Sequence, residues 1–372
     1  MRLVITGGGT GGHIYPAIAV AKYFQDAPGT EIIFIGSSAG PEGDTARAEG
    51  LYFEGLELSG LVGMDPVAAV RALGRFSAAT MRCRRLFKSE RPDCLVGTGG
   101  YAAAPATFAA AWMKVHFVTI EPNFQPGLVT RVLSRRAGAV AVAFDGTAAL
   151  LPRGARVRVT GVPVRREIER LASDDARDEA KEEALRFFEL DEGRSTLLVF
   201  GGSQGAQALN DALWSALESN KTGADLQILH LTGKRAHQDP RRSRAESETS
   251  RGSVYKALPY CDRMELAYAV ADLALTRAGA GTIAELTAAA LPAVLVPYPY
   301  ASGHQDLNAR ELGASGAALV VDQEGDSAER AVREALSLLD DSGRLARMRD
   351  ALRVPGRTPG TEGIAALVEE LT

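Results

Sequence analysis

The sequence has little cysteine and no long apolar stretch, and each shortage excludes a class of protein. Three of the 372 residues are cysteine, and Cys83, Cys94 and Cys261 are odd in number and far apart. They give neither a disulfide framework nor a metal cluster, and they indicate a reducing compartment. No apolar run approaches the roughly 18–20 residues that a membrane-spanning helix needs.

The sequence also lacks an excess of positive charge and a recognisable leader. Its formal net charge of −4 argues against a general nucleic-acid binder. The N-terminus leads directly into a predicted strand, so we expect no signal peptide. We therefore expect a cytoplasmic protein, or one attached to a membrane surface. At 372 residues the chain exceeds one typical core, which predicts two domains.

The opening of the chain is a glycine-rich loop between a strand and a helix. Leu3–Ile5 reads as a buried strand, five glycines fall among the six positions 7–12, and a helix is predicted from Pro16 to Phe24. Glycines there let backbone N–H groups approach an oxygen-rich ligand at the start of the helix. Many nucleotide-binding folds share this pattern. His13 adds an ionisable group directly in the loop.

The first half repeats the alternation of strand and helix. Further strands are predicted at 31–36, 93–97 and 117–120. This alternation predicts a parallel sheet with both faces covered, whose ligands gather at the carboxyl ends of the strands. The polar residues of the three loops expected at that edge are His13, Tyr101, Glu121 and Asn123. Each loop alone also has a structural interpretation, a tight turn at Gly99 and Gly100 or a helix cap at Glu121.

Residues 61–91 combine apolar and basic side chains at helical spacing. The apolar residues include Leu61, Val67, Val70, Leu73 and Phe76, and seven arginines and lysines surround them. Such a helix can lie on an anionic membrane. It can equally be an ordinary surface helix that packs on the sheet, which is the commoner case.

The pattern restarts in the second half. A Gly/Pro turn at 161–163 and a charged helical segment from Asp174 to Arg186 mark the best domain boundary. Residues 195–200 then predict a strand, 201–206 a glycine-rich loop and 210–218 a helix. This order of strand, glycine-rich loop and helix repeats that of the opening, which predicts two similar sheet domains that face one cleft. The basic residues at 234–251 have no apolar period and predict a solvated surface loop.

The stretch from Thr276 to Glu285 predicts a strand, a glycine turn and a helix start. An anionic ligand can bind at that helix start beside Arg277, and a carboxylate at Glu285 can accept both hydroxyls of a ribose diol. Alternatively Glu285 is a carboxylate favoured by the helix dipole. His304 and Gln305 can likewise belong to a merely polar loop.

Six motifs in this order resemble the MurG family, the lipid-linked N-acetylglucosaminyltransferases of bacterial peptidoglycan synthesis. They lie at residues 7–13, 97–101, 161–165, 201–206, 277–285 and 304–309, and the resemblance spans nearly the whole chain. It implies an α/β protein with the GT-B fold, in which two facing Rossmann-like parallel-sheet domains enclose an interdomain cleft. The implied domains are an acceptor and membrane-facing domain at 1–161, a UDP-GlcNAc-binding domain at 162–345, and a helical segment at 346–372 that packs back towards the first domain.

The resemblance implies an inverting transfer of GlcNAc from UDP-GlcNAc to the C4 hydroxyl of MurNAc in undecaprenyl-pyrophosphoryl-MurNAc-pentapeptide (lipid I), which gives lipid II. The implied catalytic residues are His13, as general base or orienting group, and Glu121. Those implied for UDP-GlcNAc are Thr10, Gly11, Gly12, Asn123, Arg165, Ser203, Gln204, Gly205, Cys261, Arg277, Gly279, Glu285, His304 and Gln305. Those implied for the acceptor pyrophosphate are Gly8, Gly9, Thr10, Gly99, Gly100 and Tyr101. No metal and no cofactor is expected.

The family also binds the cytoplasmic membrane face through an apolar patch with basic neighbours. The matching residues here are Leu61, Val67, Val70, Leu73, Phe76 and Trp112, which implies peripheral attachment to the cytoplasmic face of the cell membrane. Other cell-wall synthesis proteins are possible partners; nucleic acid is not expected. The chain departs from the family at Ile120, Val162 and Ala278, where polar residues are usual. Two alternatives therefore stay open: a related GT-B transferase with another lipid or sugar acceptor, and a non-catalytic nucleotide-sugar-binding subunit.

Overall fold

The computed structural model forms two compact units, each with its own sheet. It describes residues 1–58, 66–202, 206–219, 226–248, 254–299, 303–322, 325–353 and 359–372, with the backbone alone at 66–69 and 247–248. Unit 1 comprises Met1–Arg165 with Thr358–Thr372, and unit 2 comprises Arg166–Arg357.

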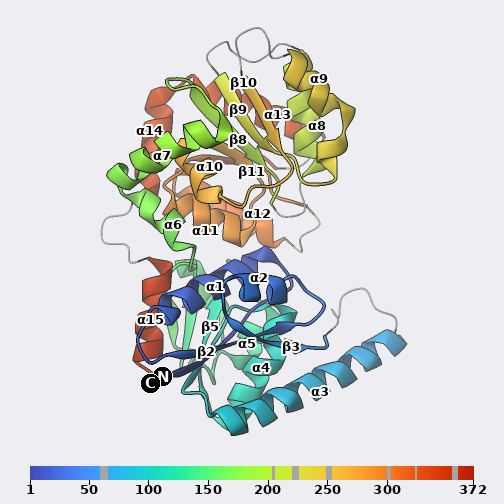
Figure 1. Cartoon of the computed structure of the whole chain (residues 1–372), viewed down its shortest axis with the longest axis vertical. Coiled ribbons are helices and arrows are strands. Elements are labelled where there is room, and N and C mark those ends of the chain that lie inside the picture. The colour runs from blue at the N-terminus through green and yellow to red at the C-terminus, as the bar shows by residue number, and fades with distance from the viewer. Residues whose placement is uncertain are drawn as a thin grey trace. The chain divides into compact units, whose positions relative to one another are not determined.

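Unit 1 contains a seven-stranded parallel sheet with helices on both faces (Figure 1). The strand order is β3-β2-β1-β4-β5-β6-β7, so the chain winds outward in both directions from β1. The strands are β1 (Arg2–Thr6), β2 (Glu31–Ser37), β3 (Tyr52–Leu56), β4 (Cys94–Gly97), β5 (His116–Glu121), β6 (Ala139–Val142) and β7 (Val157–Val159). The helices are α1 (Gly11–Gln25), α2 (Glu42–Ala48), α3 (Pro66–Glu90), α4 (Gly100–Met113), α5 (Leu128–Leu133), the 3₁₀ turn at Asp145–Leu150 and α15 (Gly360–Glu369).

Helix α15 returns to unit 1 after the chain has passed through unit 2. Its residues Ile364, Ala365, Leu367 and Val368 are buried in the same core cluster as the β1 residues Leu3 and Ile5. A β-carbon on Gly360 would come within 2.4 Å of the Val162 carbonyl oxygen, so the start of α15 lies directly against the end of the first segment. Unit 1 is thus built from two separate pieces of the chain.

Unit 2 repeats the same winding in a six-stranded parallel sheet of order β10-β9-β8-β11-β12-β13. The strands are β8 (Ser195–Phe200), β9 (Leu226–Leu231), β10 (Val254–Leu258), β11 (Leu273–Thr276), β12 (Ala293–Leu295) and β13 (Ala318–Val320). The helices are α6 (Arg166–Glu169), α7 (Asp174–Phe188), α8 (Gln207–Glu218), α9 (Pro240–Glu248), α10 (Met264–Val270), α11 (Ala280–Ala288), α12 (His304–Ala314), α13 (Ser327–Leu339) and α14 (Ser342–Leu352), with 3₁₀ turns at Arg170–Ala172 and Ala236–Gln238. The prediction of two parallel-sheet domains is confirmed.

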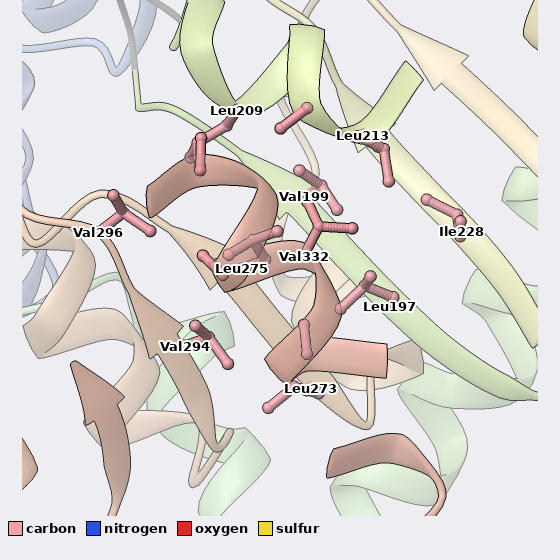
Figure 2. Packing of buried hydrophobic residues seen from close by; sticks show 14 of the residues in the cluster. Leu197, Val199, Leu209, Leu213, Ile228, Leu273, Leu275, Val294, Val296 and Val332 are labelled. Carbon is pink, nitrogen blue, oxygen red and sulfur yellow. The ribbon is translucent and has the colours of Figure 1, made fainter. Parts of the chain in front are cut away.

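One face of the second sheet packs on α8 and α13 through branched aliphatic side chains (Figure 2). Leu197 and Val199 of β8 and Leu275 of β11 meet Leu213 and Val332 there, and all five are fully or almost fully buried. Burying each such side chain is worth about 1.5–3 kcal/mol. This packing holds the strands, and hence the loops at their ends, in fixed places.

A polar network is enclosed in the core of unit 2 around His230. Trp214 Nε1 donates to the Tyr255 hydroxyl oxygen at 2.9 Å, so the Tyr255 hydroxyl proton is directed to His230 Nδ1 at 2.8 Å. Asn210 uses its amide nitrogen on the Thr232 carbonyl, so its oxygen accepts from His230 Nε2 at 2.9 Å. His230 is thus a neutral, fully bonded imidazole, and burial lowers its pKa to about 3, with a smaller effect from His237.

The structure departs from the sequence-based expectations in three places. Helix α1 begins at Gly11, so His13 lies in its first turn rather than in the loop. Residues 240–248, expected as a loop, form α9, because Ala245 is buried in the core and Arg242 pairs with Glu246 one turn along. The segment 346–372 divides, with α14 in unit 2 and α15 in unit 1.

Candidate functional site

The candidate residues of unit 1 gather at one edge of its sheet. Strands β1, β4 and β5 are neighbours, with Thr6 aligned to Gly97 and Gly97 aligned to Thr119. The segments that follow these three strands therefore leave the sheet at the same edge, which places the loops at 7–12, 98–101 and 122–127 together.

His13 is fixed by the second of these loops. Its Nδ1 lies 2.6 Å from the Thr98 carbonyl oxygen, and Thr98 Oγ1 donates to the His13 carbonyl at 2.7 Å. Because a carbonyl oxygen only accepts, Nδ1 must carry the proton, and Nε2 of the neutral ring is left as a base. Burial lowers the pKa of His13, opposed by the hydrogen bond to Thr98 and the charge of Glu121. A neutral imidazole with its basic nitrogen defined is suited to remove a proton.

The two glycine loops touch each other without side chains between them. Gly100 has φ +75°, and a β-carbon on it would lie 2.9 Å from the Gly8 carbonyl oxygen and 3.1 Å from His13 Cδ2. Gly9 has φ +86° and lies under the ring of Tyr101, whose Cε1 would be 2.8 Å from a β-carbon. The expected acceptor residues at 8–10 and 99–101 are therefore brought together, with their backbone near His13.

Glu121 holds its own turn in place. Its Oε1 accepts from the backbone and side-chain nitrogens of Asn123 at 3.2 and 3.3 Å, and its Oε2 accepts from Gly127 N at 2.9 Å and Thr130 Oγ1 at 2.7 Å. The side chain is 3% exposed. These four hydrogen bonds come from the turn that starts α5, so the helix-capping interpretation describes its geometry. Its effect on His13 is electrostatic, because its negative charge raises the His13 pKa.

Glu42 is a buried carboxylate beside the opening loop that the sequence analysis did not single out. It is 0% exposed, and its Oε1 accepts from Ser37 N at 2.8 Å. A β-carbon on Gly8 would lie 2.3 Å from Oε1, and one on Gly40 would lie 2.1 Å from Oε2. A side chain at either position would therefore force the Glu42 carboxylate to shift. The sequence pattern that could have indicated this buried carboxylate is the set of glycines at 36, 40 and 43 around one acidic residue.

The candidate residues of unit 2 gather at the corresponding edge of the second sheet. Thr276 of β11 aligns with Phe200 of β8 on one side and with Leu295 of β12 on the other. The segments after β8, β11 and β12 therefore share an edge. Ser203, Gln204 and Gly205, the expected phosphate loop, lie outside the described residues.

Arg277 is buried directly after β11. Its Nη1 donates to the Val296 carbonyl at 3.1 Å, and its guanidinium lies 5.4 Å from the centroid of the Tyr298 ring. Burial lowers its pKa, opposed by Tyr298. Gln305 Oε1 in turn accepts from Tyr298 N at 2.9 Å. These contacts tie the segments after β11 and β12 to the start of α12, where His304 also lies.

Glu285 is held by a tyrosine that the sequence analysis missed. The Tyr268 hydroxyl donates to Glu285 Oε2 at 2.7 Å, and Tyr268 is fully buried on α10. Its ring also packs against Phe200 at 6.1 Å between centroids, at the end of β8. Gly279, another expected donor residue, is the N-cap of α11, the helix that carries Glu285. A hydroxyl within the apolar run 266–270 was a weak signal by itself.

Cys261 and Arg165 are two further expected donor residues. Cys261 is 6% exposed and precedes α10. Arg165 belongs to unit 1, where its guanidinium lies 5.2 Å from the centroid of the Tyr15 ring of α1. Tyr15 is two residues beyond His13, so Arg165 packs beside the opening segment.

The expected membrane patch lies on α3 and α4. Leu61 is outside the described residues, as is the side chain of Val67. Val70, Leu73 and Trp112 are 72%, 62% and 61% exposed, and one end of α3 extends beyond the sheet of unit 1 (Figure 1). Phe76 instead packs edge-on against Phe108 of α4 at 5.6 Å. Among the described helices, none is both long and apolar enough to cross a bilayer.

Comparison with known proteins supplies the family. Residues 3–142 match the glycosyltransferase family 28 N-terminal domain, and residues 196–361 match the family 28 C-terminal domain. The UDP-N-acetylglucosamine–N-acetylmuramyl-(pentapeptide) pyrophosphoryl-undecaprenol N-acetylglucosamine transferase of Halothermothrix orenii is 38% identical, over 100% of this chain and 99% of that protein. The chain belongs to the MurG family.

Two further comparisons agree with MurG membership. The transferase of the same name from Clavibacter sepedonicus is 39% identical, over 99% of this chain and 95% of that protein. The crystal structure of MurG from Acinetobacter baumannii superposes with a TM-score of 0.75 at 26% identity, over 99% of both chains. The chain belongs to glycosyltransferase family 28. The predictions of a GT-B fold and of a glycosyltransferase are confirmed.

Proposed function

We propose that this chain transfers GlcNAc from UDP-GlcNAc to the C4 hydroxyl of MurNAc in lipid I and so forms lipid II. The observation that carries the proposal is the tautomer of His13, because Thr98 holds the proton on Nδ1 and leaves Nε2 as a base in a MurG-family chain. The acceptor is assigned to the glycine loops of unit 1, and the donor to the edge of unit 2 that carries Arg277 and Glu285.

The proposed reaction is a single displacement with inversion at C1 of GlcNAc. His13 Nε2 takes the proton of the C4 hydroxyl while its oxygen forms a bond to C1, and the bond from C1 to the UDP oxygen breaks. UDP leaves with the electron pair and the negative charge. Arg277 and the start of α11 supply positive charge and N–H dipoles in unit 2, which stabilise that leaving group.

On this proposal different residues of unit 2 contact the uracil, the ribose, the phosphates and the GlcNAc of the donor. Glu285 accepts hydrogen bonds from the two ribose hydroxyls, and the backbone near Cys261 contacts uracil. Gln305 and His304 lie near the GlcNAc, and the segment 203–205 binds the phosphates. Glu121 and Asn123 shape the turn beside His13, so Glu121 is a positioning residue rather than the base.

We further propose that the protein attaches to the cytoplasmic membrane surface through α3 and Trp112. The support is the exposure of Val70, Leu73 and Trp112 together with the stacking of Arg84, whose guanidinium lies 3.8 Å from the centroid of the Trp112 ring. A tryptophan beside an arginine suits the boundary between lipid tails and anionic headgroups.

The deciding experiment measures conversion of a short-chain lipid I analogue with labelled UDP-GlcNAc. We expect labelled lipid II analogue from UDP-GlcNAc and much less product from UDP-GalNAc or UDP-glucose. UDP-GlcNAc binding without any transfer to the lipid I analogue would overturn the proposed acceptor, and a panel of other lipid-linked sugars then tests a different one.

A further inference from the structure

Three arginines lie close enough to interact electrostatically in unit 2, at the opposite end of the sheet from the proposed donor site. Arg177 lies in the first turn of α7, and Arg349 and Arg353 belong to α14 and the residue after it. Arg353 forms an ion pair with Asp174, which joins the two helices on one flank of the unit (Figure 1). Asp272, which precedes β11, interacts electrostatically with Arg177 and accepts from Thr196 N at the start of β8. The cluster is therefore at the amino ends of β8 and β11.

Arg177 is buried with two of its guanidinium nitrogens unpaired among the described residues. The residue is 7% exposed, and its Nε and Nη2 have no hydrogen-bond partner among the residues that the structure describes. Arg349 Nε is likewise buried with no partner in the described part of the chain. Burying a guanidinium without hydrogen-bond acceptors costs several kcal/mol of folding free energy. Removing one partner from a buried ion pair costs a similar amount. Donors of two arginines are thus buried where the described residues supply too few acceptors.

The charge balance of the cluster is also incomplete. Burial lowers the pKa of Arg177 to about 10, and repulsion by Arg349 and Arg353 adds to that effect, whereas Asp174 and Asp272 act in the opposite direction. The side chain therefore stays protonated near neutral pH. Two arginines and two aspartates are the described charged groups that act on Arg177, so together with Arg177 they carry one net positive charge.

We propose that Arg177, Arg349 and Arg353 form a binding site for a small oxyanion of the phosphate class, separate from the donor site. A tetrahedral oxyanion supplies charge and several acceptor oxygens at once, which suits the planar forks of guanidinium groups. Access is from the solvent side, because Arg353 and Asp174 retain 36% and 71% of their side-chain exposure while Arg177 lies beneath. Binding stabilises unit 2 by joining α7 to α14.

The test is the melting temperature of the whole protein with inorganic phosphate against sodium chloride at equal ionic strength. Saturating UDP is present throughout, so that phosphate does not report on a nucleotide site. At ten times its dissociation constant, phosphate raises the melting temperature by about 3–5 °C. Phenyl phosphate, run in parallel, distinguishes a site for the free ion from one that accepts a phosphate monoester.

Two variants of α14 with the same change of charge make the test specific. Arg349→Gln removes a member of the cluster, and the shift with phosphate disappears although the protein still folds, since a repulsive neighbour of Arg177 has been lost. Arg347→Gln, an exposed position on the same helix, keeps the full shift. Equal responses of the two variants, or no difference between phosphate and chloride in the unaltered protein, would mean that water alone fills the cluster, and the proposal fails.

Discussion

The Tyr268 hydroxyl donates a hydrogen bond of 2.7 Å to Oε2 of Glu285, and this bond connects α10 to α11. Tyr268 also packs on Phe200, the last residue of β8 before the expected phosphate loop. One buried tyrosine thus contacts elements assigned to the ribose and to the phosphates. Its loss should therefore weaken donor binding rather than slow the chemical step.

Replacing Tyr268 with phenylalanine tests that coupling. A hydrogen bond to a charged group is worth about 1.5–3 kcal/mol, so Tyr268→Phe should raise the KM for UDP-GlcNAc by about one to two orders of magnitude and leave kcat within about twofold. The preference for UDP-GlcNAc over its 2′-deoxyribose analogue should fall as well. Tyr52→Phe, at a side chain exposed on β3, is the matched control and should change neither quantity.

The second prediction concerns His13 as the base. His13→Ala should lower kcat by about 10²–10⁴-fold and leave UDP-GlcNAc affinity unchanged. A base works in its neutral form, so kcat falls as the pH drops through the pKa, and burial lowers that pKa. The acid limb of the kcat–pH profile should therefore have its midpoint below the ordinary histidine value of about 6.5. Undiminished turnover of the alanine variant would exclude His13 as the base.

The third prediction separates Glu121 from that role. Its negative charge raises the His13 pKa, so Glu121→Gln should move the acid limb of kcat to still lower pH. The variant also places an amide nitrogen among donors, which should reduce stability by about 1–3 kcal/mol. We expect kcat at pH 8 to stay within about tenfold. A hundredfold loss at pH 8 in a folded variant would instead make Glu121 part of the chemical step.

The fourth prediction follows from the buried His230. The folded state holds this side chain neutral with a pKa of about 3, whereas the unfolded chain binds a proton below about pH 6.5. The unfolded state therefore binds more protons in that range, and acidification favours it. Between about pH 6.5 and 3 the free energy of unfolding of unit 2 should fall by up to ~1.4 kcal/mol per pH unit because of this residue.

Urea unfolding at pH 7, 6 and 5, followed by Trp214 fluorescence in a Trp112→Phe background, measures this dependence. His230→Gln should be less stable at pH 7, because it disturbs the bonds to Tyr255 and Asn210. Its stability should nevertheless depend less on pH, and a slope equal to that of the parent would contradict the assignment.

The fifth prediction concerns membrane attachment. Leu73→Ser combined with Trp112→Ala should reduce sedimentation with vesicles that contain anionic lipid, since both side chains are largely exposed on α3 and α4. UDP-GlcNAc affinity should stay unchanged. Tyr52→Ser removes an equally exposed aromatic residue from β3 and should leave vesicle binding intact. Equal vesicle binding by the double variant and the parent would remove α3 from the membrane surface.

The sequence was sufficient for the fold because the strand signals are local. Runs such as Leu3–Ile5 and Leu197–Val199 are apolar and short, and each is followed by glycine and then by a helical pattern. This order predicts a parallel winding, and that winding places the loops at one edge. Helix α9 was not predictable in the same way, because Ala245 is the buried side chain among its described residues and ion pairs replace the usual apolar stripe.

The site was predictable to the extent that its residues lie in glycine-rich motifs. His13, Arg277 and Glu285 follow such motifs and were found, but the partners that orient them were not all visible. Tyr268 lies within an apolar run, and Glu42 in an exposed-looking polar stretch, so neither is distinguished until the chain is folded. The hydrogen atom on His13 Nδ1 is likewise set by a carbonyl 85 residues away.

The return of α15 to unit 1 affects the order in which the molecule can be completed on the ribosome. Unit 2 is one continuous segment and can fold as soon as it emerges, whereas the core of unit 1 lacks Ile364, Leu367 and Val368 until residues 360–369 have been made. The core of unit 1, which begins first on the ribosome, is therefore completed last. The apolar surface beside α1 that α15 covers stays exposed to solvent while unit 2 is synthesised. A chain released before α15 would carry a complete second unit and a first unit dependent on chaperones.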